Sequence, residues 1–143
     1  MTEMTARQKE IVEVAVKLIA QGGIQNLTMS NLAKHIGVSE PALYRHFESK
    51  MEILRAMLGQ FKAHSEGLFA QARSLDGSEM RLLETIFLGR AKHFAANPHL
   101  APVIFAEEAF RNEPRLAEEV FAIMTLAHET VAHIVAGAQA KGT

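Results

Sequence analysis

The chain has 143 residues, enough for one compact domain or for a small module with a second helical layer. Hydrophobic residues make up 48% of it, which argues against disorder, and it has no cysteine, which excludes disulfides, thiolate metal sites and cysteine catalysis. Its formal net charge is −1, so binding to nucleic acid would require a local basic patch.

Helical patterns follow one another from the N-terminus, and no segment shows the alternation of a strand. Thr5 and Gln8 form a capping-box pattern before an apolar stripe, which the glycine pair at 22–23 ends. Thr28 is the expected N-cap of a second helix, and Gly37 ends that helix after barely two turns.

A third and a fourth helix are expected next. Ser39 caps the third, which we expect to reach about His46. Ser49 and Glu52 form another capping box, which opens a long helix to about Arg73. The buried stripe of the long helix is predicted to consist of Leu54, Met57, Leu58, Phe61, Leu68, Phe69 and Ala72.

The second half of the chain continues the helical pattern. Three more helices are expected, over about residues 79–96, 100–110 and 115–136. The breaks before them contain Gly77, Pro98 and Pro114, residues that interrupt helices. The sequence therefore predicts an all-α protein.

The spacing within residues 28–47 is typical of a helix-turn-helix. This motif needs a small residue at the helix crossing, a glycine in the turn and an apolar plug on the second helix. Ala33, Gly37 and Leu43 supply these in that order. The second helix, about residues 40–46, would then be a recognition helix in the DNA major groove. The alternative is a plain three-helix bundle with a basic surface patch.

Residues 27–54, LTMSNLAKHIGVSEPALYRHFESKMEIL, resemble the DNA-binding signature of the tetracycline-repressor (TetR) family of bacterial transcriptional regulators. The Gly-Val-Ser-x-x-x-Leu-Tyr-x-His-Phe-x-x-Lys run is nearly complete, and the likeness covers residues 5–54. It implies a helix-turn-helix DNA-binding domain over residues 1–49. It also implies a partial helical ligand-binding or regulatory domain over residues 50–143, without the C-terminal dimerisation helices of the family.

The resemblance and the side-chain chemistry together assign a set of DNA contacts. Phosphate contacts are expected from Thr28, Ser39, Tyr44, His46 and Lys50. By resemblance, the base-facing positions are Ser30, Glu40, Pro41 and Ala42. Glu40 can accept from a cytosine amino group, and Ala42 can touch a thymine methyl. Arg45 receives no role.

The second half offers a candidate effector pocket that is mostly aromatic. It would be lined by Phe61, Phe87, Arg90, Phe94, Phe105, Phe121, Met124 and His128. Arg90 and His128 would orient an apolar or anionic small molecule. In the alternative, Arg90 pairs with Glu107, His128 is a satisfied core histidine and the aromatic side chains belong to an ordinary core.

The combined expectation is a sequence-specific DNA-binding transcriptional regulator, a repressor released from a palindromic operator by a small-molecule ligand. Two recognition helices one helical turn apart require a homodimer of the full-length protein. The alternative is a DNA-binding protein whose C-terminal half binds a protein partner, because SEPALYRHFESK is also similar to nucleoid-occlusion regulators within the family.

Other function classes find no support in the sequence. No Ser-His-Asp arrangement, phosphate loop or carboxylate dyad can be placed, so we expect no enzyme and no cofactor. His128 and His133 are five residues apart, which is off the i, i+4 spacing of a metal site on one helix face. The polar N-terminus and the lack of 18 uninterrupted apolar residues predict a cytoplasmic protein without a membrane span.

Overall fold

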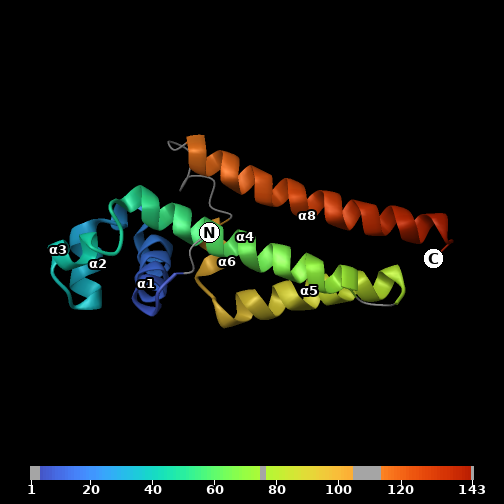
Figure 1. Cartoon of the computed structure of the whole chain (residues 1–143), viewed down its shortest axis with the longest axis horizontal. Helices are drawn as coiled ribbons and strands as arrows, with labels where there is room; N and C mark the ends of the chain where they lie inside the picture. The colour runs from blue at the N-terminus through green and yellow to red at the C-terminus, as the bar shows by residue number, and fades with distance from the viewer. Residues whose placement is uncertain (1–3, 75–76, 105–113, 143) are drawn as a thin grey trace.

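The computed structural model describes residues 4–74, 77–104 and 114–142, and every regular element within these ranges is helical. The elements are α1 (Ala6–Gly22), the 3-10 turn η1 (Ile24–Asn26), α2 (Met29–Ile36), α3 (Glu40–Tyr44), α4 (Lys50–Ser74), α5 (Glu79–Ala96), α6 (Leu100–Ile104) and α8 (Pro114–Ala140). Helices α1 to α3 form one end of an elongated molecule, and α4 leads from that end alongside α5 and α8 (Figure 1). The expected all-α class is confirmed.

The predicted helix boundaries near the N-terminus are confirmed by the cap geometry. The Thr5 hydroxyl accepts from the Gln8 backbone N–H at 3.1 Å, and the Gln8 side chain accepts from the Thr5 N–H at 2.9 Å. Gly37 ends α2 in the left-handed conformation, with φ 86° and ψ 32°. These local signals are readable from sequence because each cap bonds within four residues.

Helix α3 is shorter than predicted, since it ends at Tyr44 and not near His46. The backbone tightens there: the Arg45 N–H donates to the Ala42 carbonyl at 3.3 Å, and the His46 N–H to the Leu43 carbonyl at 3.0 Å. Such i→i+3 bonds are common where a helix ends. The following residue, Phe47, is then 6% exposed and joins the core, as predicted.

The long helix α4 has the predicted apolar stripe, all of which is buried, and this stripe contributes to two clusters. The larger cluster joins the first half of α4 to the buried faces of α1 to α3 and includes Val103, Leu116 and Ile123. The smaller cluster consists of Leu68, Phe69, Ala72, Ile86 and Ile134. The predicted domain boundary between residues 49 and 50 therefore coincides with the start of α4, but the hydrophobic core continues across it.

Helix α8 reaches Ala140, four residues beyond the predicted end. Ala138 is buried, and the Lys141 ammonium lies 2.6 Å from the Glu79 carboxylate, so contact with α5 continues past Gly137. The most apolar 18-residue window of α8 has mean hydropathy 1.4 and is only 11% buried; its length and composition alone would also suit a membrane span. Here α8 packs along α4 and α5 (Figure 1).

Candidate functional site

Helices α2 and α3 form the helix-turn-helix that the sequence predicts. Ala33 is 3% exposed at the crossing, and its carbonyl accepts from the N–H groups of Gly37 and Val38 at 2.9 and 3.0 Å. Leu43 is fully buried and holds α3 against the core. The turn is therefore fixed by backbone bonds, and α3 by one apolar plug.

The two N-caps leave hydrogens available at the surface. The Thr28 hydroxyl accepts from the Asn31 N–H at 3.0 Å, and the Ser39 hydroxyl from the Ala42 N–H at 3.2 Å. A hydroxyl that accepts in a cap still has its own hydrogen to donate. Both residues are exposed, so a phosphate oxygen could receive these hydrogens.

The first turn of α3 is accessible from outside. Of the predicted contact residues, Ser30, Glu40, Pro41, Tyr44 and His46 are exposed, and Ala42 is half-buried. Tyr44 is 48% exposed, which is unusual for a large aromatic side chain. Arg45, which the sequence left unassigned, is also exposed just after α3.

Lys50 differs from the other predicted contacts. Its side chain is half-buried, and its ammonium donates to the Ile24 carbonyl at 3.1 Å. The lysine therefore ties the start of α4 to the turn after α1, and two of its three hydrogens remain for other partners. A second tie lies nearby, because the Gln8 side chain donates to the His46 carbonyl at 3.1 Å.

Three members of the predicted effector pocket meet between α4 and α5. The Arg90 guanidinium carbon lies 4.7 Å from the centre of the Phe61 ring and 6.0 Å from that of Phe94. Arg90 also donates to the buried Ser65 hydroxyl at 2.9 Å, while its buried Nη1 atom has no hydrogen-bond partner among the residues that the structure describes. Burial lowers the pKa of Arg90. Among the described residues, the contacts of the Arg90 guanidinium are the two aromatic rings and Ser65.

Next to Arg90, two imidazoles are stacked. The rings of His64 and His93 are 3.6 Å apart at an angle of 16°. Burial, and then the Arg90 charge, lower the pKa of His64. Burial, and then the charges of His64 and Arg90, lower the pKa of His93. The contact is therefore compatible with neutral rings, and protonating either would place a charge against Arg90.

The other predicted pocket residues are not brought together. Phe87 and Phe121 are 60% and 73% exposed and face solvent, because the stripes that contain them are covered only in part. His128 is exposed, so it is not a core histidine either. Met124 is half-buried. Phe105 lies outside the described residues, as does the predicted Arg90 partner Glu107.

The comparisons with known proteins decide the family. Residues 11–57 match the family model described as bacterial regulatory proteins, tetR family. Residues 11–57 therefore belong to the TetR family. The matched segment runs from α1 through the helix-turn-helix into α4, the part in which the sequence resemblance and the geometry agree. Membership also agrees with the expectation of a non-enzymatic protein, since the family consists of regulatory proteins.

Two curated relatives align with 80% of this chain. The nucleoid occlusion factor SlmA of Actinobacillus pleuropneumoniae is 25% identical over 115 residues, which are 80% of this chain and 57% of the relative. The HTH-type transcriptional repressor KstR2 of Mycobacterium tuberculosis is 31% identical over 119 residues, 80% of this chain and 58% of the relative. The chain thus spans less than two thirds of the length of these relatives.

Solved TetR-family structures share the fold. The ketosteroid transcriptional regulator KstR2 of M. tuberculosis superimposes with a TM-score of 0.85 at 17% identity, covering 98% of this chain and 71% of that one. The regulator PfmR of Thermus thermophilus gives 0.78 at 22% identity, with 92% and 71% covered. The likeness includes the helices after α4, where the family model has no match.

Proposed function

We propose that the chain binds double-stranded DNA through α3, as a sequence-specific transcriptional regulator. The observation that carries this proposal is the exposed first turn of α3, where Glu40, Pro41 and Ala42 stand over the buried Leu43. Short side chains there let the helix approach base edges. The capping hydroxyls of Thr28 and Ser39, together with Tyr44, His46 and Lys50, would supply the phosphate contacts.

Selection of bound fragments from random DNA tests this function in the full-length protein. The expected product is a palindrome whose half-sites lie about one helical turn apart, roughly 34–36 Å, because two copies of α3 read successive major grooves. Glu40→Gln is expected to change the preferred sequence, and Tyr44→Phe to weaken binding to all sequences similarly. Failure to enrich any sequence would contradict the proposal, and an enriched single half-site would contradict the dimer.

The regulator is proposed to be a repressor that a small molecule releases from its operator. The likeness to the repressor KstR2, at 31% identity, supports the direction of regulation. Phe61, Arg90 and Phe94, which contact one another between α4 and α5, support effector binding near that interface. Release requires a ligand that binds more tightly to the conformation in which the two copies of α3 in the dimer are too far apart or too close together to fit DNA. Only such a difference in affinity shifts the equilibrium between the two conformations.

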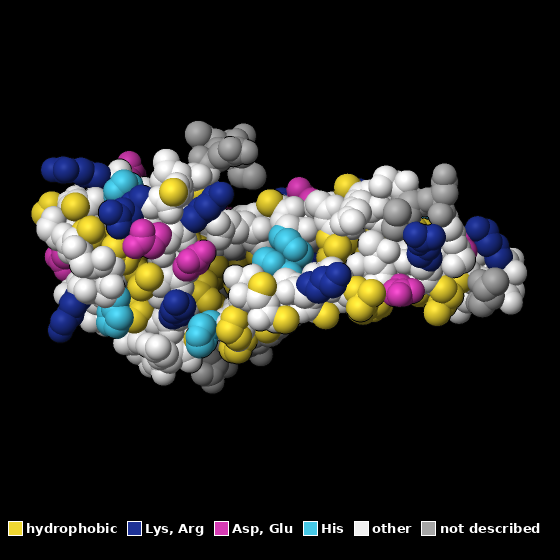
Figure 2. Space-filling view, turned by 90° about the horizontal axis from the view of Figure 1, so that it is seen from below, with side chains coloured by type: hydrophobic (Ala, Val, Ile, Leu, Met, Phe, Trp, Pro, Cys, Tyr) yellow, Lys and Arg dark blue, Asp and Glu magenta, His cyan; other side chains and the backbone are white. Residues whose placement is uncertain are grey.

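A second candidate function is favoured by a different observation. Met80, Phe87 and Leu88 on α5 are 62%, 60% and 51% exposed. Figure 2 shows exposed hydrophobic side chains along the part of the molecule that α5 contributes. Exposed apolar patches often mark protein interfaces, and the likeness to SlmA, a nucleoid occlusion factor, agrees with such a role.

The two candidates make different predictions for apolar compounds. An effector site predicts that a lipophilic compound raises the melting temperature of the purified protein and weakens DNA binding. A protein-binding surface predicts no response to such compounds, together with loss of one specific partner in the Phe87→Ser variant and unchanged affinity for DNA.

A further inference from the structure

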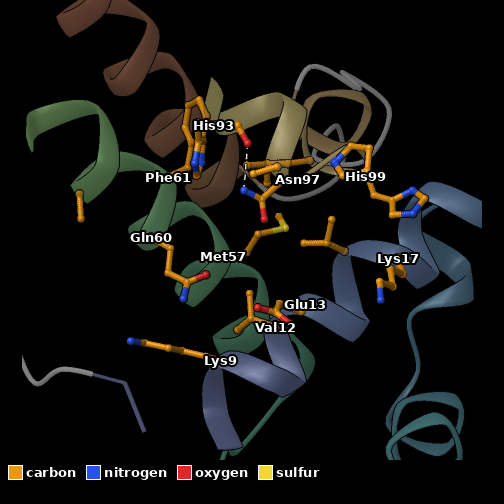
Figure 3. A pocket seen from close by; sticks show the side chains of 15 residues that line it. Lys9, Val12, Glu13, Lys17, Met57, Gln60, Phe61, His93, Asn97 and His99 are labelled. Atoms are coloured by element: carbon orange, nitrogen blue, oxygen red, sulfur yellow. Dashed lines mark hydrogen bonds between the residues drawn. The ribbon is translucent and has the colours of Figure 1, made fainter. Parts of the chain in front are cut away.

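A pocket of about 600 Å³ lies between α1, the middle of α4 and the corner where α5 leads into α6 (Figure 3). It is distinct from the surface of α3 and joins the helix-turn-helix unit to the helices behind it. Small-molecule sites commonly have volumes of roughly 300–1,000 Å³. The position and the size together make this pocket a candidate for a ligand that affects the position of the DNA-binding end.

The lining combines an apolar part with polar side chains from three elements. The apolar part consists of Val12, Val16, Met57, Phe61, Ala63, Ala96, Pro98 and Leu100. The polar part consists of Lys9, Glu13, Lys17, Gln60, His93, Asn97 and His99. Apolar walls with a few convergent polar groups are the usual composition of sites for small organic molecules.

The charges around this pocket favour an anion. In the described part of the chain no ion pair engages Lys9, Glu13 or Lys17. Glu13 offsets one of the two ammonium groups, and the imidazoles of His93 and His99 carry no negative charge. The Arg90 guanidinium, whose central carbon lies 4.7 Å from the centre of the Phe61 ring, adds a positive charge next to this lining residue. With two lysines and one glutamate, the lining has more positive than negative side chains.

We propose that this pocket binds a small amphipathic carboxylate. Its apolar body lies against Met57 and Phe61, and its carboxylate lies at Lys17 and His99. Figure 3 shows these two polar side chains on one side of the pocket and Lys9 with the neutral Gln60 on the other. The side with two groups able to carry positive charge is the stronger carboxylate site.

The ligand would contact two elements at once, α1 and the turn that leads into α6, which already pack against each other. Lys17 and Val16 belong to α1, whereas His99 lies just before α6. Holding them together fixes the orientation of the helix-turn-helix unit relative to α5 and α6. This inference gives the proposed regulation a place and a ligand class, and so rests on it, but ligand binding itself requires no DNA.

Calorimetric titration of the purified chain in the absence of DNA tests the site. The probes are 4-phenylbutyrate and its neutral counterpart 4-phenylbutanol. We expect Lys17→Gln to weaken binding of the carboxylate about tenfold, which corresponds to about 1.4 kcal/mol, because the variant loses a charge-assisted hydrogen bond at an exposed side chain. Lys9→Gln removes the same charge from the same helix and is expected to have a smaller effect. Neither variant should change binding of the alcohol.

A second pair of variants tests the location. Ala96 is exposed on the pocket wall, so Ala96→Phe should fill the pocket and abolish binding of both probes without disturbing the core. Ala95 is its exposed neighbour outside the lining, and Ala95→Phe should leave binding unchanged. Absence of carboxylate binding, equal losses in the two lysine variants, or full binding in Ala96→Phe would each overturn the proposal. The DNA selection described above has its own outcome and does not depend on these results.

Discussion

Gly37 determines the geometry of the turn between α2 and α3. Its φ of 86° lies in the left-handed region, and a Cβ added there would meet no atom of the described residues within 4 Å. The effect of a side chain is therefore backbone strain alone. We expect Gly37→Ala to lower the free energy of unfolding in urea by about 1 kcal/mol, and Gly37→Asn by less, because Asn tolerates this conformation. Equal losses in the two variants would contradict this explanation.

Lys50 combines a structural bond with a predicted DNA contact, and the two can be separated. Loss of the bond to the Ile24 carbonyl, 3.1 Å long, should lower the stability of Lys50→Ala. Loss of a phosphate contact should also reduce the dependence of log affinity on log salt by about one unit per half-site. Denaturation and binding measured at several salt concentrations give both quantities. Reduced stability with an unchanged salt slope would show that Lys50 acts only within the protein.

The contact between α4 and α5 should make stability depend on pH. The pKa values of His64 and His93 lie below their ordinary value of 6.5. The unfolded chain therefore binds more protons than the folded one just below that pH. The stability that the neutral rings of His64 and His93 contribute is fully present above about pH 6.5. It is lost as the pH falls through the lowered pKa values that these residues have in the folded chain. No loss of stability between about pH 7 and pH 5 would contradict the stacked arrangement.

Substitutions at the stacked rings identify the source of this pH dependence. His93→Phe keeps an aromatic ring against His64 and removes one titrating group, so its stability should vary less with pH than that of the unaltered chain. His128→Gln, at an exposed histidine of α8, is the matched control and should leave the pH profile unchanged. Melting temperatures over the pH range give the comparison.

The elements that could be predicted from sequence are those defined by local bonds. Thr5, Gly37 and Ser39 each form their caps within a few residues, so their types and positions indicate the helix ends. The effector pocket could not be predicted in this way. Periodicity places Phe87 and Phe121 on apolar stripes, but the neighbours that cover a stripe come from other helices.

The residues that sequence reasoning missed make contacts between distant segments. His64 stacks on the ring of His93, which belongs to another helix, and the pocket beside it combines α1 with the end of α5. No spacing rule connects such positions in a single sequence. The one available signal was the histidine at position 64 on the long helix, four residues before the buried Leu68, and it indicates only that the ring lies near the covered face.

At the scale of the whole molecule, α4 connects two cores of unequal size. Among the described residues, the cluster at the DNA-binding end has 19 buried members, and the distal one has five. Buried apolar area is the main source of stability, so the distal parts of α5 and α8 should open more readily than α1 to α4. Local opening of this kind would leave the helix-turn-helix intact.

Hydrogen exchange on a pair of core variants tests this difference. Phe69 is 1% exposed and is the largest side chain of the distal cluster, so Phe69→Ala should cost about 3–5 kcal/mol locally. We expect faster amide exchange in α5 and in the second half of α8, with α1 and α2 protected as before. Leu54→Ala, in the larger cluster, should instead accelerate exchange throughout the chain, because α4 carries both cores. If Phe69→Ala accelerated exchange equally in α1, the molecule would unfold as a single cooperative unit.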